Sequence, residues 1–238
     1  MKRRFLTIGL IVFALTNQNL EQQAQAIFKS WFVDFEPFRD GKFMDSELGP
    51  IPEGWQVGTL EEIIELHDSR RVPLSGSQRE KMKKIYPYYG AASLMDYVED
   101  YLFDGAYTLL GEDGTVVTDD GMPILQYVWG KFWVNNHAHI LTGKKGHSPE
   151  TLYILLKNTP IKSIVTGAVQ PKISQAGLKS VPVIISPDKL TIKFKELIAP
   201  LFAKTRDNHE ESNRLAALRD TLLPKLMSGE IDVSDVEV

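Results

Sequence analysis

Residues 191–227 read TIKFKELIAPLFAKTRDNHEESNRLAALRDTLLPKLM, and the architecture follows from this stretch because it predicts one long helix. Apolar side chains recur along it every seven residues, a repeat that keeps an apolar seam turned toward a partner helix. The seam contains Phe194, Leu201, Leu215, Leu218 and Leu222, and Asn208 occupies one of the repeat positions. A polar residue in such a seam costs stability but can fix the register and number of the paired helices. At about 1.5 Å per residue the helix is roughly 50 Å long, which is typical of a spacer.

A second helix is predicted over residues 17–36, near the start of the chain. Its apolar stripe contains Leu20, Ala24, Ile27 and Trp31, at the spacing expected for one face of a helix. Residues 1–16, with a basic start and an apolar run, also fit a secretory signal peptide that is cut at residues 24–26, and the chain would then be an exported interaction protein. The helical spacing continues through that cleavage site, which favours one uncut helix. The apolar run is also too short to span a bilayer.

Residues 47–190, between the two helices, predict a compact α+β domain with a mixed or antiparallel sheet. Short apolar runs bounded by Gly-rich turns predict strands at residues 107–110, 124–129, 132–134, 138–141 and 181–185. Short helices are predicted at residues 59–65 and 150–157. The remaining divisions are the first helix with its linker (17–46), the spacer helix (191–228) and a loose acidic tail (229–238).

The charges of the chain are unevenly distributed along its 238 residues, which carry a formal net charge of −4. Residues 67–84 hold six basic and two acidic residues, and residues 131–172 hold six lysines and one glutamate. Between them, residues 96–120 hold eight acidic residues and no basic one. Because phosphate binding needs local Lys and Arg, this pattern permits an oriented DNA face with the acidic segment turned away. The lack of cysteine suits a reducing, cytoplasmic environment.

Three basic or polar segments are the candidate DNA contacts. The first choice is the pair Arg70 and Arg71, because arginine can grip the edge of guanine with two hydrogen bonds. The same loop continues with Ser77, Gln78 and Arg79, and then with Lys81, Lys83 and Lys84, which suit phosphates better than bases. The other two segments are Gly-flanked loops that contain Gln170, Lys172 and Ser174, and Lys144, Lys145 and His147. The alternative for each is a solvated or turn-closing loop without a ligand.

Catalytic and metal-binding signals are weak. Residues 111–114 read GEDG but lack the lysine and the following helix of a phosphate-binding loop. His137 and His139 alternate on a predicted strand and so point to one face, but structural zinc prefers four ligands and there is no cysteine. We therefore expect no metal or cofactor and no catalytic residues. A small Mg-dependent nuclease remains an alternative, since such sites need only a few scattered acidic residues and a lysine. Tyr86, Tyr88 and Tyr89 could stack on an extruded base, although core positions are more common for such residues.

Several motifs of this chain resemble, in the same order, those of type I restriction–modification specificity subunits. The resemblance covers residues 17–231 and rests on LEQQAQAIFKSWFVDF at 20–35, LGPIPEGW at 48–55, YPYYGA at 86–91, DG at 104–105, GEDG at 111–114, TGAVQPKIS at 166–174 and LAALRDTLLPKLMSGE at 215–230. It implies that residues 47–190 are a target-recognition domain that reads one half of a bipartite site in double-stranded DNA. It also implies that the long helices set the distance between the halves and hold the modification (methyltransferase) subunits, and through them the restriction subunit. Methylation and cleavage would then belong to those partners.

The chain departs from the family pattern in one respect. Family members usually carry two recognition domains, whereas this sequence contains one, and residues 1–16 match nothing in the family. Helices at both ends of a single domain can pair with a second copy, so we expect a homodimer that reads a palindromic target. A rearranged or split gene product is the alternative.

Overall fold

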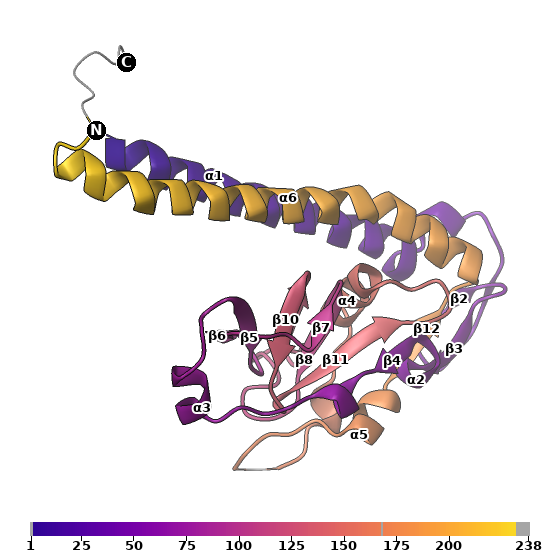
Figure 1. The fold of residues 1–238 in the computed structure, drawn as a ribbon. Coiled ribbons are helices and arrows are strands. Elements are labelled where there is room, and N and C mark those ends of the chain that lie inside the picture. Colours follow the sequence, from indigo (N-terminus) through magenta and orange to yellow (C-terminus); the bar gives the residue numbers. More distant parts are fainter. Residues whose placement is uncertain (1, 168, 232–238) are drawn as a thin grey trace. The chain divides into compact units, whose positions relative to one another are not determined.

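The computed structural model describes residues 2–167 and 169–231. The chain divides into two compact units, an α+β unit of residues 27–198 and a helical unit of residues 1–26 and 199–238 (Figure 1). Residues 232–238, the greater part of the predicted tail, lie outside the described residues. Within the described residues, no helix is long and apolar enough to cross a membrane.

Two helices make up the helical unit, and both continue into the α+β unit. They are α1 (Lys2–Phe28) and α6 (Asp188–Met227), the second of which contains Pro200 and Pro224 without a break. Because α1 begins at Lys2 and runs past residue 26, one helix crosses the site where a signal peptide would be cut. The prediction that one helix runs through residues 24–26 is therefore confirmed, and this helix starts well before residue 17.

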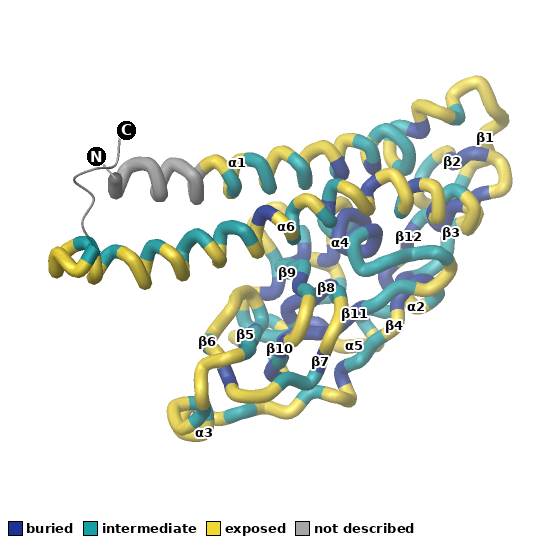
Figure 2. The backbone as a smooth tube through the Cα atoms, turned by 45° about the horizontal axis from the view of Figure 1, so that its top comes forward, coloured by how far each residue is buried: buried dark blue, intermediate teal, exposed yellow. Residues whose placement is uncertain are grey.

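The two helices pair through the polar position that the seven-residue repeat singled out. Asn208 is 2% exposed, and its Nδ2 donates a hydrogen bond of 2.8 Å to Oδ1 of Asn17 on α1. Ala24 is fully buried, whereas the predicted seam residues Leu218 and Leu222 are 47% and 43% exposed (Figure 2). The pairing predicted around Asn208 is thus present within this chain. Leu218 and Leu222, near the C-terminal end of α6, are not covered within the described part of the chain, and their place in a helix seam stays a prediction.

Two four-stranded sheets form the centre of the α+β unit. The first is antiparallel, with the order β4 (Ile64–Leu66), β11 (Ala138–Gly143), β8 (Tyr107–Gly111) and β9 (Leu125–Val128). The second has the order β6 (Leu94–Val98), β5 (Tyr86–Tyr89), β10 (Lys131–Val134) and β7 (Phe103–Asp104). Its β5 and β10 run parallel, so the predicted mixed α+β architecture is confirmed.

Two short ribbons and four short helices complete this unit. The ribbons pair β1 (Phe43–Met44) with β2 (Ile51–Pro52), and β3 (Gln56–Thr59) with β12 (Pro182–Ile185). The helices are α2 (Leu60–Ile63), α3 (Gly76–Glu80), α4 (Pro149–Lys157) and α5 (Gln175–Lys179). The helix predicted at residues 59–65 is shorter than expected, because residues 64–66 leave it to pair with β11. All five predicted strands are present.

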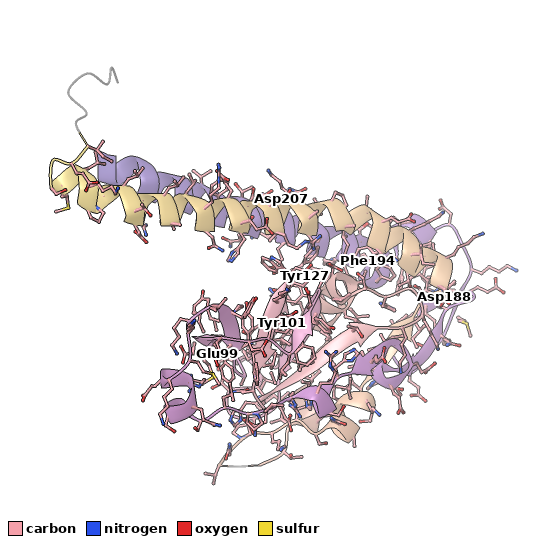
Figure 3. The ribbon with its side chains drawn as sticks, viewed as in Figure 1. Glu99, Tyr101, Tyr127, Asp188, Phe194 and Asp207 are labelled. Carbon is pink, nitrogen blue, oxygen red and sulfur yellow. The ribbon has the colours of Figure 1, made fainter. Side chains whose placement is uncertain are left out.

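The core of the α+β unit lies between the sheets. It consists of Phe103, Leu109, Val128, Phe132, Val134, Ala138 and Ile140, each at most 2% exposed. Tyr88 is also 2% exposed, which confirms the core position expected for that tyrosine, and its hydroxyl accepts a hydrogen bond from the backbone of Leu74. Figure 3 shows Tyr101 on the loop between β6 and β7 and Phe194 at the start of α6.

Candidate nucleic-acid interface

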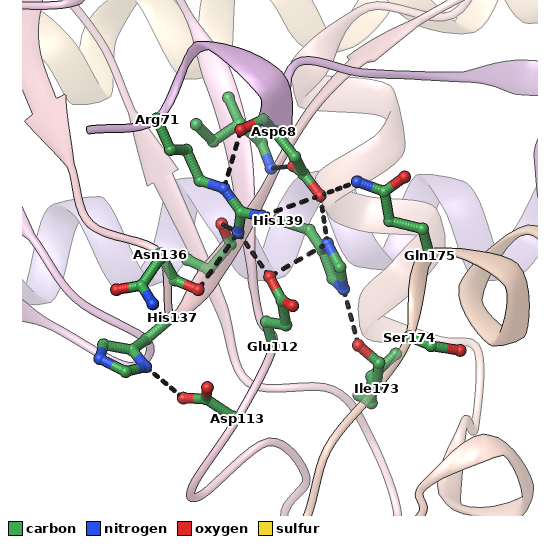
Figure 4. Close-up of polar contacts among 12 residues, drawn as sticks. Asp68, Arg71, Glu112, Asp113, Asn136, His137, His139, Ile173, Ser174 and Gln175 are labelled. Atoms are coloured by element: carbon green, nitrogen blue, oxygen red, sulfur yellow. Dashed lines mark hydrogen bonds and ion pairs between the residues drawn. The ribbon is translucent and has the colours of Figure 1, made fainter. Parts of the chain in front are cut away.

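A buried ion cluster lies where three loops of the α+β unit meet, and we define it as Asp68, Arg71, Glu112 and His139 (Figure 4). The Arg71 guanidinium lies 2.5 Å from Glu112 Oε2 and 3.6 Å from Asp68 Oδ2. His139 Nδ1 lies 2.6 Å from Asp68 Oδ2 and 3.8 Å from Glu112 Oε2. Lys172 approaches from the surface, with its Nζ 3.3 Å from Glu112 Oε1. The donor atoms of Asp68, Glu112 and His139 are close enough together for a metal, but Arg71 already supplies a cation between the carboxylates.

His139 is fully buried, and both of its ring nitrogens face acceptors. Nδ1 faces the Asp68 carboxylate at 2.6 Å, and Nε2 lies 2.8 Å from the carbonyl oxygen of Ile173. Each ring nitrogen therefore has a hydrogen-bond partner, one a carboxylate and the other a backbone carbonyl. His139 thereby ties the strand β11 to the loop before α5.

The two carboxyl groups of the ion cluster stay ionised. Burial alone would raise the pKa of Asp68. That pKa nevertheless lies below its ordinary value, because His139 lowers it through a hydrogen bond and its charge, and the Ile140 N–H and the Arg71 charge lower it further. Burial opposes ionisation of Glu112 in the same way, and the hydrogen bond from Arg71 with the nearby positive charges again lowers its pKa. Opposite charges and donated hydrogen bonds therefore outweigh desolvation at both sites.

The predicted base-reading role of Arg71 does not fit its surroundings. The side chain is 13% exposed, and besides its ion pairs it donates hydrogen bonds to the carbonyl oxygens of Asp68 and Ala138. A guanidinium used in this way has no free edge for guanine. Its neighbour Arg70 is exposed, donates to the Leu102 carbonyl at 2.7 Å and lies over the Phe103 ring at 4.5 Å. Of the two arginines, Arg70 thus remains the candidate for base reading.

Residues 75–84 form the helix α3 and the turn that follows it. The Gln78 side chain accepts a hydrogen bond from the backbone of Ser75 and thereby caps the helix, while it stays exposed. Arg79 is 17% exposed and pairs with Asp96 at 2.9 Å, whereas Lys84 pairs with the same carboxylate at 2.8 Å and is 45% exposed. The hydrogen bond from Lys84 is the main reason that the pKa of Asp96 is lowered. The candidates that remain exposed are Ser77, Gln78, Lys81, Lys83 and Lys84.

The loop of residues 166–174 is closed at its base by two backbone hydrogen bonds. Thr166 N donates to Lys172 O at 2.9 Å, and Lys172 N donates to Thr166 O at 2.8 Å. Gly167 has φ +85, and a Cβ there would lie 2.3 Å from the Gln170 carbonyl, so the tight turn requires glycine. Gln170 is exposed, as is half of the Lys172 side chain (51%), while the Ser174 hydroxyl caps α5 through Gly177 N.

The third predicted segment contains Lys144, Lys145 and His147. It follows the C-terminal end of β11, whereas the ion cluster lies near the start of that strand. His139 is the second residue of that strand, and Lys144 follows its last, so roughly 17 Å of strand separates them. Lys145 pairs with Glu62 at 2.8 Å. His147 lines a cavity of about 520 Å³ with Phe28, Phe194 and other apolar residues. Burial lowers the pKa of His147 to about 4, and the ring is therefore neutral at pH 7. A neutral ring offers no positive charge to a phosphate, and the phosphate contact of His147 stays a prediction.

The ion cluster as a unit was not predicted from the sequence. His137 and His139 were expected on one face, but His137 precedes β11 and its Nδ1 lies 2.5 Å from Asp113 Oδ1, while His139 is interior. The available signal was the glutamate of the Gly-rich turn at residues 111–114, which follows a strand with a buried-type pattern. We name the exposed candidate residues of the two neighbouring loops the loop face: Arg70, Ser77, Gln78, Lys81, Lys83, Lys84, Gln170, Lys172 and Ser174.

Comparisons with known proteins agree with the resemblance. The family described as type I restriction modification DNA specificity domain matches residues 52–206. A Haemophilus influenzae protein assigned as a type I restriction enzyme specificity subunit is 31% identical over 162 residues, which cover 67% of this chain and 41% of that protein. The MjaIX specificity subunit of Methanocaldococcus jannaschii is 28% identical, with 92% of this chain and 55% of that protein covered.

Among solved structures, the type I restriction–modification S subunit from M. genitalium is similar in fold. Its TM-score is 0.57 at 16% sequence identity, with 94% of this chain and 56% of that chain covered. The chain thus spans about half the length of the relatives it matches. Since the family match covers well over half of the chain, the protein belongs to the family of type I restriction–modification DNA specificity domains.

Proposed function

We propose that the α+β unit recognises one half of a bipartite double-stranded DNA site, through the loop face. The observation that carries this proposal is the convergence of two basic loops that are about a hundred residues apart in sequence. Arg71 and Lys172 bind the same Glu112 carboxylate, which brings the bases of the two loops together and supports the proposal that their exposed residues act as one surface. Lysines on such a surface suit phosphates, whereas Arg70 and Gln170 suit the edges of guanine and adenine.

The direct test is selection of bound duplexes from a pool with a randomised segment, using the full chain. We expect enrichment of one short motif and affinity that falls steeply with salt. Sequencing of methylated sites in cells that express the chain with modification subunits should return the same motif. Enrichment of no motif in either experiment would refute sequence recognition. Cleavage of the duplexes in Mg²⁺ by this chain alone would instead support the nuclease alternative.

The proposal includes partners that carry the chemistry. Methyl transfer and cleavage are assigned to the modification and restriction subunits, as the family resemblance implies, and action on cellular DNA places the chain in the cytoplasm. Copurification with modification subunits, and loss of methylation when this chain is deleted, test the assignment. Methylation of the motif by modification subunits alone would contradict it.

We further propose a homodimer through the helical unit. Support comes from large apolar side chains that remain exposed on both helices: Val12 (52%), Leu15 (61%), Leu218 (47%) and Leu222 (43%). A closed two-fold dimer presents the same patch on both partners, and it would give the complex a second recognition domain and a palindromic target. Light scattering at micromolar concentration should show a dimer that Leu218→Glu with Leu222→Glu dissociates. A monomeric parent chain would refute this.

A further inference from the structure

Glu112 connects three segments that are distant in sequence. Its Oε2 accepts from Arg71, in the loop after β4, and its Oε1 lies 3.3 Å from Lys172, in the loop before α5. Glu112 itself directly follows β8. Its backbone completes the junction, because Glu112 N donates to His137 O and Glu112 O accepts from Ile173 N, each at 2.8 Å. One residue therefore fixes the bases of both loops that carry the loop face.

Asp68 makes the same kind of connection from the opposite side of the ion cluster. Its Oδ2 accepts from His139 Nδ1 at 2.6 Å and from Gln175 Nε2 at 2.7 Å, and its Oδ1 accepts from Ile140 N at 2.9 Å. Asp68 belongs to the short 3-10 helix η3 (Asp68–Arg70), and Gln175 begins α5. Segments 68–71 and 172–175 are thus held to each other twice, once through each carboxylate.

The members of the ion cluster are not available to a ligand. The side chains of His139, Asp68, Arg71 and Glu112 are 0%, 2%, 13% and 13% exposed. Buried ion pairs commonly give little net stability compared with apolar residues of similar volume, and their best-attested use is to select one arrangement of the chain. Four charged residues buried beneath two exposed loops fit that use better than a contribution to general stability.

We infer that Asp68, Arg71, Glu112 and His139 are positioning residues, which hold the two DNA-binding loops in a single arrangement and so determine how well the protein discriminates between sequences. This inference rests on the proposed function. A looser pair of loops still carries the same lysines, so it keeps its attraction for phosphates. It loses the fixed side-chain placement on which base reading depends.

Glu112→Gln tests the inference because it keeps the size of the side chain and removes the charge that joins the loops. In the free protein, we expect backbone amides of residues 172–175 to exchange hydrogen about tenfold faster, as loss of one charge-assisted hydrogen bond predicts. Amides in β8 should be unchanged. The affinity ratio between the selected duplex and a scrambled duplex should fall about tenfold. Affinity for the scrambled duplex should hold or rise, because one negative charge is lost and Lys172 is released.

Two further variants make the result decisive. Glu211→Gln removes the same charge from an exposed ion pair with Arg214 in the helical unit, and should alter neither exchange nor discrimination. Gln175→Ala removes a hydrogen bond from an uncharged donor to Asp68 and changes no charge, so it carries the test if Glu112→Gln does not fold, and should produce a smaller change in the same direction.

Three outcomes overturn or separate the claims. Unchanged exchange at residues 172–175 in both loop variants would overturn the positioning role. An equal loss of affinity for both duplexes, with a lower melting temperature, would show a role in general stability and also overturn it. If the parent protein prefers no duplex, the proposed function fails, and the exchange measurement on the free protein still decides whether the ion cluster holds the loops.

Discussion

The hydrogen bond between Asn208 and Asn17 allows the pairing of the two long helices to be tested quantitatively. Asn208 is 2% exposed and donates to Asn17 Oδ1 at 2.8 Å. Asn208→Ala removes that bond, which contributes about 1 kcal/mol, and leaves a small cavity. Alanine also favours a helix over asparagine by roughly 0.5 kcal/mol, so part of the loss is masked. The exposed Asn213→Ala on the same helix measures that propensity term alone.

The assay is urea unfolding of the full chain, followed by circular dichroism, for Asn17→Ala, Asn208→Ala and the double variant. We expect a coupling free energy of about 0.5–1.5 kcal/mol, because either single change removes the same hydrogen bond. Asn208→Leu should instead raise stability, since burial of a leucine side chain gains about 1.5–3 kcal/mol, while the register of the helices loosens. Zero coupling, or an Asn208→Leu variant as unstable as Asn208→Ala, would refute the pairing described for α1 and α6.

Three further predictions address the site, the cavity and the end of the long helix. Arg70→Ala should weaken specific DNA binding by about 1–3 kcal/mol and leave the melting temperature unchanged. Arg71→Ala should instead destabilise the fold by about 3–5 kcal/mol, because it leaves buried carboxylates unpaired. The reverse pattern in binding and melting assays would contradict the placement of both arginines. The pKa of His147 is about 4 in the fold and ordinarily 6.5, so the unfolded chain takes up a proton first as the pH falls. Stability should therefore be constant above pH 6.5 and fall by roughly 3 kcal/mol between pH 6.5 and 4, and His147→Gln should remove that part of the pH dependence in urea titrations. Leu222 is 43% exposed, so Leu222→Ala should lower the free energy of unfolding of a monomer by less than about 1 kcal/mol. A loss of about 2 kcal/mol or more that depends on protein concentration would indicate that a second molecule covers Leu222.

The long helices were predictable because their signal is periodic and repeated. Seven-residue spacing places Asn208 opposite α1 without knowledge of the rest of the fold, and the structure confirms that position. The strands around Phe132 and Ile140 were predictable for a related reason, since short apolar runs bounded by turns have few other interpretations. The strand β5 was missed because Pro87 lies inside it, and proline within a run argues against a strand that is paired on both sides.

The site was harder to predict, because its geometry depends on contacts between distant residues. Asp68 and His139 are 71 positions apart, and Arg71 and Glu112 are 41 positions apart. Nothing in the local pattern distinguishes Arg70 from Arg71, although one is exposed and the other is enclosed by carboxylates. The basic charge of residues 144–147 likewise does not reveal its position, in a turn at the opposite end of β11 from the ion cluster. Composition indicates that cations are present, and only the fold shows which of them remain exposed to solvent.

The side chains that anchor the two loops differ from those that the loops expose. Glu112 and Asp68 hold the bases of the loops, while Ser77 and Gln170 extend from them into solvent. Replacement of the exposed residues therefore leaves the anchors untouched. A combinatorial library that randomises Ser77, Lys81 and Gln170 and keeps the buried residues constant should retain a high fraction of folded members, and it offers a compact starting point for engineering new target preferences into this scaffold.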